Sequence, residues 1–154
     1  MLDPLSVAIY DHQLYIIGRS ATRVRCYRFS RIRDVEVMPI AFEYPSRTEF
    51  DPDQLFGSSF GVFIGTDFDV EDIRIKLAPR WKNYALTHRW HRSQKVDVTK
   101  EDVIISLHAR VCPELQQWVL SFGEEAEVLE PSRLRSDIAA RIVKMASVYA
   151  KRPS

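Results

Sequence analysis

The residues most able to do chemistry in this sequence are arginines that gather near the N-terminus. Between Arg19 and Arg33 the chain has no aspartate or glutamate. The arginines of this stretch are Arg19, Arg23, Arg25, Arg28, Arg31 and Arg33. A guanidinium group is planar and pairs two of its N–H groups with the oxygens of a phosphate or carboxylate. The stretch therefore predicts a site for an anionic ligand, with single-stranded nucleic acid as one candidate.

A second acid-free stretch lies between Ile73 and Val96. It contains Arg74, Lys76, Arg80, Lys82, Arg89, Arg92 and Lys95, with Trp81, Tyr84 and Trp90 among them. Aromatic rings beside basic residues can stack on nucleic-acid bases. Alternatively, the cations form a solvated face and the rings turn into the core. Trp81 and Tyr84 have the spacing of an apolar helix stripe, which favours the second interpretation for these two rings.

No enzymatic chemistry is indicated elsewhere. Gly57-Ser58-Ser59-Phe60-Gly61 matches the spacing G-x-S-x-G, but a nucleophile elbow needs a strand before its serine and a helix after it. Here a loop rich in Pro and Asp comes before Ser59 and a β-like run follows, so we predict a turn. His88 and His91 have no third ligand at metal-site spacing. We expect a binding module with no catalytic residue, no metal and no cofactor.

Composition sets the remaining limits. The 154 residues are 45% hydrophobic and 28% charged, which is ordinary for a globular protein. The formal net charge of +1 offers no long-range attraction for nucleic acid, so recognition depends on local clusters. Cys26 and Cys112 are too few for a disulfide framework, which favours a reduced, cytoplasmic setting. No apolar run approaches the ~20 residues that span a bilayer, and no membrane partner is expected.

The arginine stretch must be positioned by β structure. Residues 6–10 and 14–17 are apolar and flank a turn at residues 11–13, which predicts a hairpin. A second turn is expected at residues 18–22 and a longer strand over residues 23–37. In a regular strand Arg28 shares a face with Val24 and Cys26, whereas a bulge would turn it outward. On an apolar face it needs an anionic partner, because burying an unpaired charge is costly.

The middle of the chain changes character. Residues 38–61 hold several Pro, Asp and Gly residues, which predicts a loop, and we place a domain boundary near residue 52. From residue 70 the alternation of Ile73, Ile75 and Leu77 predicts a strand. Further strands are expected over residues 95–98, 103–109 and 126–129.

Helices are expected between and after these strands. Proline suits the first position of a helix, and Pro79, Pro113 and Pro131 each stand where a helix is predicted. The last helix has an apolar side made by Leu134, Ile138, Ile142, Met145 and Tyr149. The resulting order is strand–helix–strand–strand–helix–strand with a terminal helix, which is typical of ferredoxin-like folds. The predicted fold class is α+β, a β-rich piece followed by this domain.

Two segments resemble a known family. Pro4-Leu5-Ser6-Val7-Ala8, a turn and Leu14-Tyr15-Ile16-Ile17 resemble the segment that names the WYL domain. Leu14 and Ile16 replace that motif's tryptophan and leucine, so only Tyr15 matches outright. The run Tyr27-Arg28-Phe29-Ser30-Arg31-Ile32 is similar to the family's aromatic-Arg-x-x-Arg-Ile run.

The rest of the chain resembles the C-terminal extension (WCX domain) that accompanies WYL domains. The similar segments are Arg89-Trp90-His91-Arg92-Ser93-Gln94, residues 115–123, and Val128-Leu129-Glu130-Pro131 with Leu134-Arg135. The resemblance therefore covers nearly the whole chain, and the order and spacing of its motifs make it specific.

The resemblance implies a bacterial transcription regulator. Such proteins join a winged helix-turn-helix, a WYL domain with an Sm- or SH3-like barrel, and the extension. By this resemblance residues 1–52 form a partial WYL domain and residues 53–154 the extension. Matching motif positions assign ligand binding to Tyr15, Arg28 and Arg31. Arg19 and Arg23 join the predicted site because they belong to the same arginine stretch.

Two functions follow as expectations. The first is a ligand-sensing and oligomerisation module, a homodimer that binds an anionic effector and contacts DNA only through a helix-turn-helix absent from this chain. The family's first strands are also absent, and a barrel without them exposes a sheet edge on which another chain can pair. The alternative is a purely structural dimerisation or partner-docking domain with no ligand.

Overall fold

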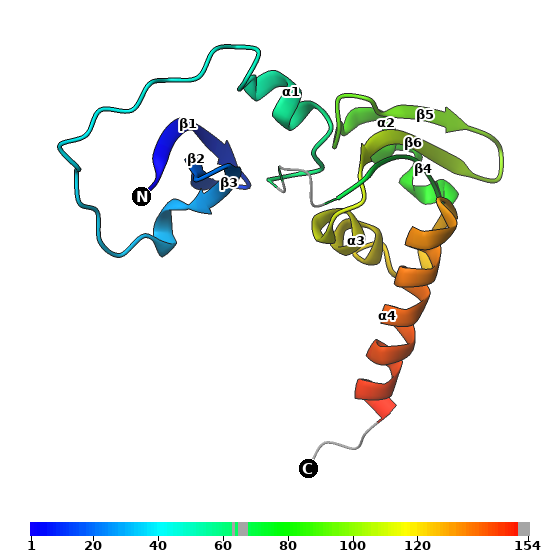
Figure 1. Ribbon diagram of the computed structural model, residues 1–154. Coiled ribbons are helices and arrows are strands. Elements are labelled where there is room, and N and C mark those ends of the chain that lie inside the picture. The colour runs from blue at the N-terminus through cyan, green and yellow to red at the C-terminus, as the bar shows by residue number, and fades with distance from the viewer. Residues whose placement is uncertain (63, 65–67, 151–154) are drawn as a thin grey trace. The chain divides into compact units, whose positions relative to one another are not determined.

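The computed structural model describes residues 1–62, 64 and 68–150. The chain divides into two compact units, Met1–Phe68 and Asp69–Ser154 (Figure 1). A three-stranded sheet belongs to the first unit and a four-stranded sheet to the second, and both are antiparallel. With the helices that accompany them, the architecture is α+β, as predicted.

The first sheet is a meander of β1 (Asp3–Tyr10), β2 (Gln13–Ser20) and β3 (Arg23–Arg28). The predicted hairpin is confirmed, because Tyr10 pairs with Gln13 across a two-residue turn. Asp11 and His12 both have positive φ, 47° and 58°, the backbone that matches the twist of two antiparallel strands. The sheet stays open, since its described strands pair only in the order β1-β2-β3.

Two predicted boundaries in this region are wrong. Residues 18–20, expected in a turn, belong to β2. The strand expected over residues 23–37 ends at Arg28, and Phe29–Arg31 forms a 3₁₀ helix. The reason is the length of the partner strand. Arg28 pairs with Tyr15, and β2 has just two more residues before its own turn, so residues beyond Arg28 have little backbone with which to pair.

One face of the first sheet is covered by residues that follow it in the chain. Its buried core consists of Leu5, Ile17, Phe50 and Ile64, with Ala8, Val24, Cys26, Leu55 and Phe56 packed against it. The cover includes α1 (Pro52–Gly57), whose first backbone N–H groups donate to the side chain of Asp51. In addition, the Tyr44 hydroxyl donates to the backbone oxygen of Leu5 at 2.7 Å.

This cover explains where the units divide. A boundary near residue 52 was expected, but the units separate between Phe68 and Asp69. Leu55, Phe56 and Ile64 bury apolar surface against the first sheet, which ties residues 53–68 to the first unit. Ser59 of the G-x-S-x-G spacing is 5% exposed and donates its hydroxyl to the backbone oxygen of Leu55 at 2.9 Å. It follows α1 rather than a strand, so the elbow geometry is absent there.

The second unit has the predicted order of elements. Its strands are β4 (Val70–Leu77), β5 (Lys95–Val98), β6 (Val103–Arg110) and β7 (Ala126–Glu130), and its helices are α2 (Lys82–Thr87), α3 (Pro113–Leu120) and α4 (Ser132–Ala150). Short 3₁₀ helices, η2 (Pro79–Trp81) and η3 (Gly123–Glu125), precede α2 and β7. The strands lie in the order β5-β6-β4-β7, and every neighbouring pair is antiparallel.

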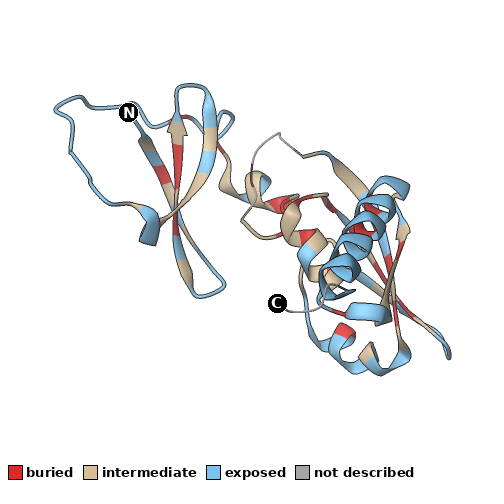
Figure 2. Ribbon diagram, turned by 90° about the horizontal axis from the view of Figure 1, so that it is seen from below, coloured by how far each residue is buried: buried red, intermediate tan, exposed pale blue. Residues whose placement is uncertain are grey.

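The two faces of this sheet differ sharply. The predicted alternation is confirmed, because Ile73, Ile75 and Leu77 are fully buried. Val103, Ile105 and Leu107 of β6 lie on the same face and are at most 3% exposed. In Figure 2 the buried positions, in red, recur along the strands of the sheet. Most of the alternate residues of β4 and β6 carry charged or polar groups, such as the His108 side chain, whose Nδ1 lies 2.8 Å from an Asp72 carboxylate oxygen.

The terminal helix packs along only part of its length. Leu134 and Ile138 of α4 are buried, and the helix contacts β7 and α3. Farther along, Ile142, Met145 and Tyr149 are 50%, 47% and 87% exposed. Figure 1 shows this part of α4 running on beyond the sheet of its own unit. The predicted apolar side is therefore half core and half surface.

Candidate ligand-binding site

Tyr15 and Arg28 form the centre of the candidate site. They are cross-strand partners on β2 and β3, and the strand alternation places them on the face that carries Ile17 and Cys26. An Arg28 Nη2 group donates to the Tyr15 hydroxyl at 3.2 Å. The guanidinium carbon lies 5.7 Å from the centre of the Tyr15 ring, within cation–π range. Arg28 thus lies on the apolar face that the regular strand predicts, without an intervening bulge.

The positive charge of Arg28 is not balanced by an ion pair within the described residues. The side chain is half-buried, and its two polar contacts there, the hydrogen bond and the ring contact, are both with Tyr15. A guanidinium has five N–H donors, so most of its capacity to bind an anion remains. Tyr15 is 7% exposed and holds the guanidinium in place from below the surface.

The remaining predicted site residues do not join this pair equally. Arg19 lies on the same face, but its guanidinium forms an ion pair with Asp3 at 3.2 Å. It is opposite Val24, four residues from Arg28 along β3, which corresponds to roughly 13 Å. Arg23 is exposed on the opposite face of the sheet. Arg31 is exposed in the 3₁₀ helix that follows β3.

The opposite face of the first sheet is a feature that the sequence analysis missed. Val7 and Ile9 of β1 are 63% and 79% exposed, and Leu14 of β2 is 38% exposed. Arg23 and Arg25 alternate onto the same face. The sequence does contain an indication of this face. Apolar residues occupy both faces of β1 and β2, and this pattern is typical of strands that are covered on both sides.

Three cations of the second basic stretch are paired with acids from β7 and the turn before it. Lys76 contacts Glu127 at 2.8 Å, Arg74 contacts Glu130 at 3.4 Å, and Arg80 pairs with Glu125. The hydrogen bond from Lys76, helped by a second from Arg135, lowers the pKa of the Glu127 carboxyl, and the same contact with Glu127 raises the pKa of Lys76. The charges of these three cations are therefore each balanced by an acid within the second unit.

The aromatic residues of this stretch divide between core and surface. Trp81 turns inward as predicted, with its ring edge-on to Phe122 at 4.9 Å and its Nε1–H donating to Glu125 at 2.7 Å. Tyr84, predicted to be core, is instead 41% exposed. Its ring rests on those of His88 and Trp90, at 4.6 and 5.3 Å between centroids. The helix α2 has six residues and buries one side. Ala85 is its buried residue, and Tyr84 is left at the surface.

The histidines occupy unrelated environments. His91 is 6% exposed and its Nδ1 lies 2.7 Å from the Ser93 hydroxyl, whereas His108 is on the charged face of the second sheet. In the part of the chain that the structure describes, no three His, Cys, Asp or Glu side chains are grouped so that they could hold a metal ion. Among the described helices, none is both long and apolar enough to cross a membrane.

Comparison with known families agrees with these units. A model of the WCX domain matches residues 69–146, just over half of the 154-residue chain, and a model of the WYL domain matches residues 1–37. The chain therefore belongs to the WCX family, with a WYL segment in front, as the resemblance implied. No curated protein matches the sequence.

Both kinds of domain are typical of the regulatory modules of transcription regulators, and neither belongs to an enzyme family. The WCX match begins at the residue where the second compact unit begins. The residues between the two matches, 38–68, include the segment that covers the first sheet.

Proposed function

We propose that this module senses an anionic effector for a transcription regulator, and that Arg28, positioned by Tyr15, makes the principal contact. The observation that carries the proposal is a half-buried guanidinium on the apolar face of a sheet, without a carboxylate partner among the described residues. A phosphate or carboxylate would balance that charge and accept two N–H groups at once. Arg31, three residues along the chain, would supply a second cation.

Single-stranded nucleic acid is the polymeric effector that we propose to test first. Phosphate groups repeat along such a strand, so Arg28 and Arg31 can each meet one. Tyr15 is nearly buried and serves to orient Arg28, so it offers little ring surface to a base. The proposed contact is therefore with the backbone, which implies weak sequence preference and strong salt dependence.

The double substitution Arg28→Gln/Arg31→Gln is expected to weaken binding of fluorescein-labelled single-stranded DNA at least about tenfold, because two phosphate contacts are lost. Fluorescence anisotropy at several salt concentrations measures it. The slope of log affinity against log salt should also fall by about 1.4, since each phosphate contact on a single strand contributes about 0.7.

The matched control is Arg23→Gln/Arg25→Gln, which removes the same charge from the opposite face of the same strand. We expect this control to keep affinity within about threefold of the native chain, since its arginines are only surface charges. Equal losses in both double variants would point to non-specific attraction, and unchanged binding in the first variant would refute the proposed site.

For the folds of the two units we propose finer assignments. The second unit is proposed to be ferredoxin-like, supported by the strand order β5-β6-β4-β7 with helices after the first and third strands. The first sheet is proposed to be part of a small Sm- or SH3-like barrel. Its support is an antiparallel meander of three strands with apolar residues on both faces.

A second role, self-association, is favoured by α4. Ile138, Ile142, Met145 and Tyr149 follow one another at intervals of four, three and four residues, the spacing of a coiled-coil seam. The seam begins in the core of the unit and continues as exposed side chains. We propose that the exposed part packs against α4 of a second copy, which would make the module a homodimer.

Ile142→Glu/Met145→Glu is expected to convert this dimer to a monomer, raising its dissociation constant by at least about 100-fold because two charges would enter an apolar seam. Sedimentation velocity across a range of protein concentrations measures the change. Ala140→Glu/Ser147→Glu adds the same charge to the opposite side of α4 and should leave the dimer intact. A native chain that stays monomeric at every concentration would exclude this role.

A further inference from the structure

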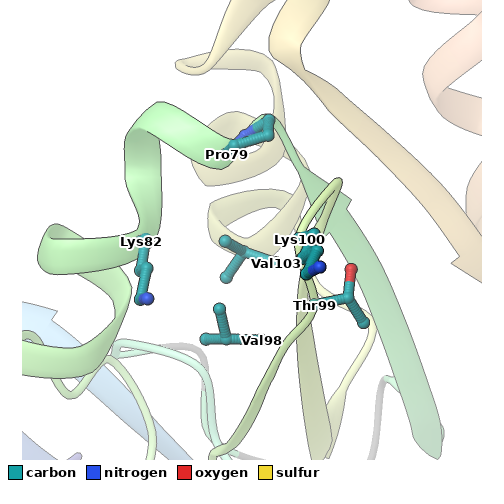
Figure 3. Close-up of a pocket in the computed structure, with 6 residues that line it drawn as sticks. All are labelled: Pro79, Lys82, Val98, Thr99, Lys100 and Val103. Atoms are coloured by element: carbon teal, nitrogen blue, oxygen red, sulfur yellow. The ribbon is translucent and has the colours of Figure 1, made fainter.

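A cavity in the second unit lies apart from the sites discussed so far. It has a volume of about 500 Å³ and opens between the η2–α2 segment and the turn that joins β5 to β6. Its lining residues are Pro79, Lys82, Val98, Thr99, Lys100 and Val103 (Figure 3). Cavities that hold small organic ligands measure roughly 300–1,000 Å³, so this one has a suitable size.

The lining has an apolar base and a charged rim. Val103 is 1% exposed and belongs to the core face of β6, and Val98 is its cross-strand partner on β5. Pro79 adds a third apolar surface. Figure 3 shows Lys82 and Lys100 on either side of the two valines, one from α2 and the other from the β5–β6 turn.

The two lysines differ from nearby cations of β4 and η2. Lys76 of β4 and Arg80 of η2 are paired with Glu127 and Glu125. Neither Lys82 nor Lys100 forms an ion pair with any described residue, and both are exposed. Asp102 is close to Lys100 in the sequence, but its charge acts on Lys76. Together with the stronger effect of Glu127, it raises the pKa of Lys76. Lys82 and Lys100 therefore both bring unbalanced positive charge to the rim of the cavity.

The turn that carries Lys100 is held by its own hydrogen bonds. The Thr99 hydroxyl accepts from the backbone N–H of Asp102 at 3.0 Å and from that of Glu101 at 3.3 Å. The backbone N–H of Thr99 also donates to the Asp102 oxygen at 2.9 Å. Thr99 is therefore committed to the turn, and what the rim offers a ligand is the pair of ammonium groups.

We propose that this cavity is a second ligand site, which takes a small organic anion. Its phosphate or carboxylate group would lie between Lys82 and Lys100, and an apolar or aromatic body would rest on Val98, Val103 and Pro79. Such a site needs neither Tyr15 nor Arg28. A negative binding result at the cavity would therefore not contradict the site proposed at Arg28, and the reverse also holds. An anion with an apolar body should bind better than the same anion alone, because it also covers apolar surface.

The test is a titration of the full chain with phenyl phosphate, benzoate and inorganic phosphate, followed by two-dimensional ¹H–¹⁵N NMR. Phenyl phosphate or benzoate should shift the amide signals of residues 79–82 and 98–103 in a saturable manner. Comparison of the two distinguishes phosphate from carboxylate. The preferred aromatic anion should bind at least about tenfold more tightly than inorganic phosphate, a difference well within what such a site can supply.

Lys82→Gln/Lys100→Gln should weaken the preferred anion at least about tenfold, since both charges that face it are lost. Lys95→Gln/Lys144→Gln removes two exposed lysines that do not line the cavity and should bind as the native chain does. The proposal is overturned by the absence of saturable shifts up to about 10 mM ligand, by undiminished binding in the first variant, or by equal affinity for inorganic phosphate.

Discussion

Replacing Phe50 with alanine is expected to lower the free energy of unfolding of the first unit by about 3–5 kcal/mol, the usual cost of truncating a buried phenylalanine. Phe50 is 5% exposed and is one of four buried residues in a small core. So large a loss is comparable to the whole stability of a small domain. Urea denaturation followed by hydrogen exchange of the β1–β3 amides measures it.

The same substitution at an exposed position is the control. Phe29 is 53% exposed, and Phe29→Ala should cost less than about 1 kcal/mol. Ile64→Ala should also weaken protection of β1–β3, because Ile64 belongs to that core although it lies beyond the boundary expected near residue 52. Loss of protection confined to residues 69–150 in either core variant would contradict the assignment of this segment to the first unit.

The core and the candidate site of the first unit are linked. Tyr15 and Arg28 are held together by the pairing of β2 with β3, on the face that Phe50 helps to cover. Phe50→Ala should therefore also weaken effector binding, although Phe50 contributes no charge. Arg28→Gln/Arg31→Gln should weaken binding with a far smaller loss of stability than Phe50→Ala, which separates a contact with the ligand from a structural effect.

Leu115→Ala is the second large effect that we expect, a loss of about 2–5 kcal/mol from the second unit. Leu115 of α3 is fully buried, in a unit whose sheet face is formed by fully buried residues such as Ile75 and Leu77. Removing its three terminal carbons leaves a cavity that this packed layer cannot readily close. Chemical denaturation followed by tryptophan fluorescence is suitable, because Trp118 lies in the same helix.

Leu86→Ala provides the matched control, since it makes the same change in the helix α2, where the side chain is 55% exposed. Its effect should stay within about 1 kcal/mol, as for most surface substitutions. If the two leucine variants unfold at the same denaturant concentration, Leu115 does not have the role in the core that its burial indicates.

Alternation along strands allowed part of the fold and part of the site to be predicted. Ile73, Ile75 and Leu77 were correctly placed on one face, because successive side chains of a strand point to opposite sides. The same rule placed Arg28 of a regular strand on the apolar face of β3, and the structure shows it there, opposite Tyr15. The turn at Asp11 and His12 was also predicted, because a turn depends on only a few neighbouring residues.

Other boundaries depended on distant partners. The strand that contains Arg28 ends because its partner β2 ends. The residue types of 29–37 do not predict this end. The apolar side of α4 is uniform in the sequence, yet it is buried at Ile138 and exposed at Ile142, because the helix continues beyond the elements of its own unit.

The sequence alone therefore determined which face of β4 and β6 is apolar and where the arginines lie along the chain, because both depend on the residues themselves and on the period of a strand. Only the tertiary structure decided which charges remain unbalanced. Arg19 is neutralised by Asp3, at a position beyond the hairpin residues that were predicted, and Lys76 by Glu127 of β7, a strand distant in the sequence. Arg28 and the two cavity lysines are left without such partners among the described residues, because long-range pairing brings no carboxylate to them.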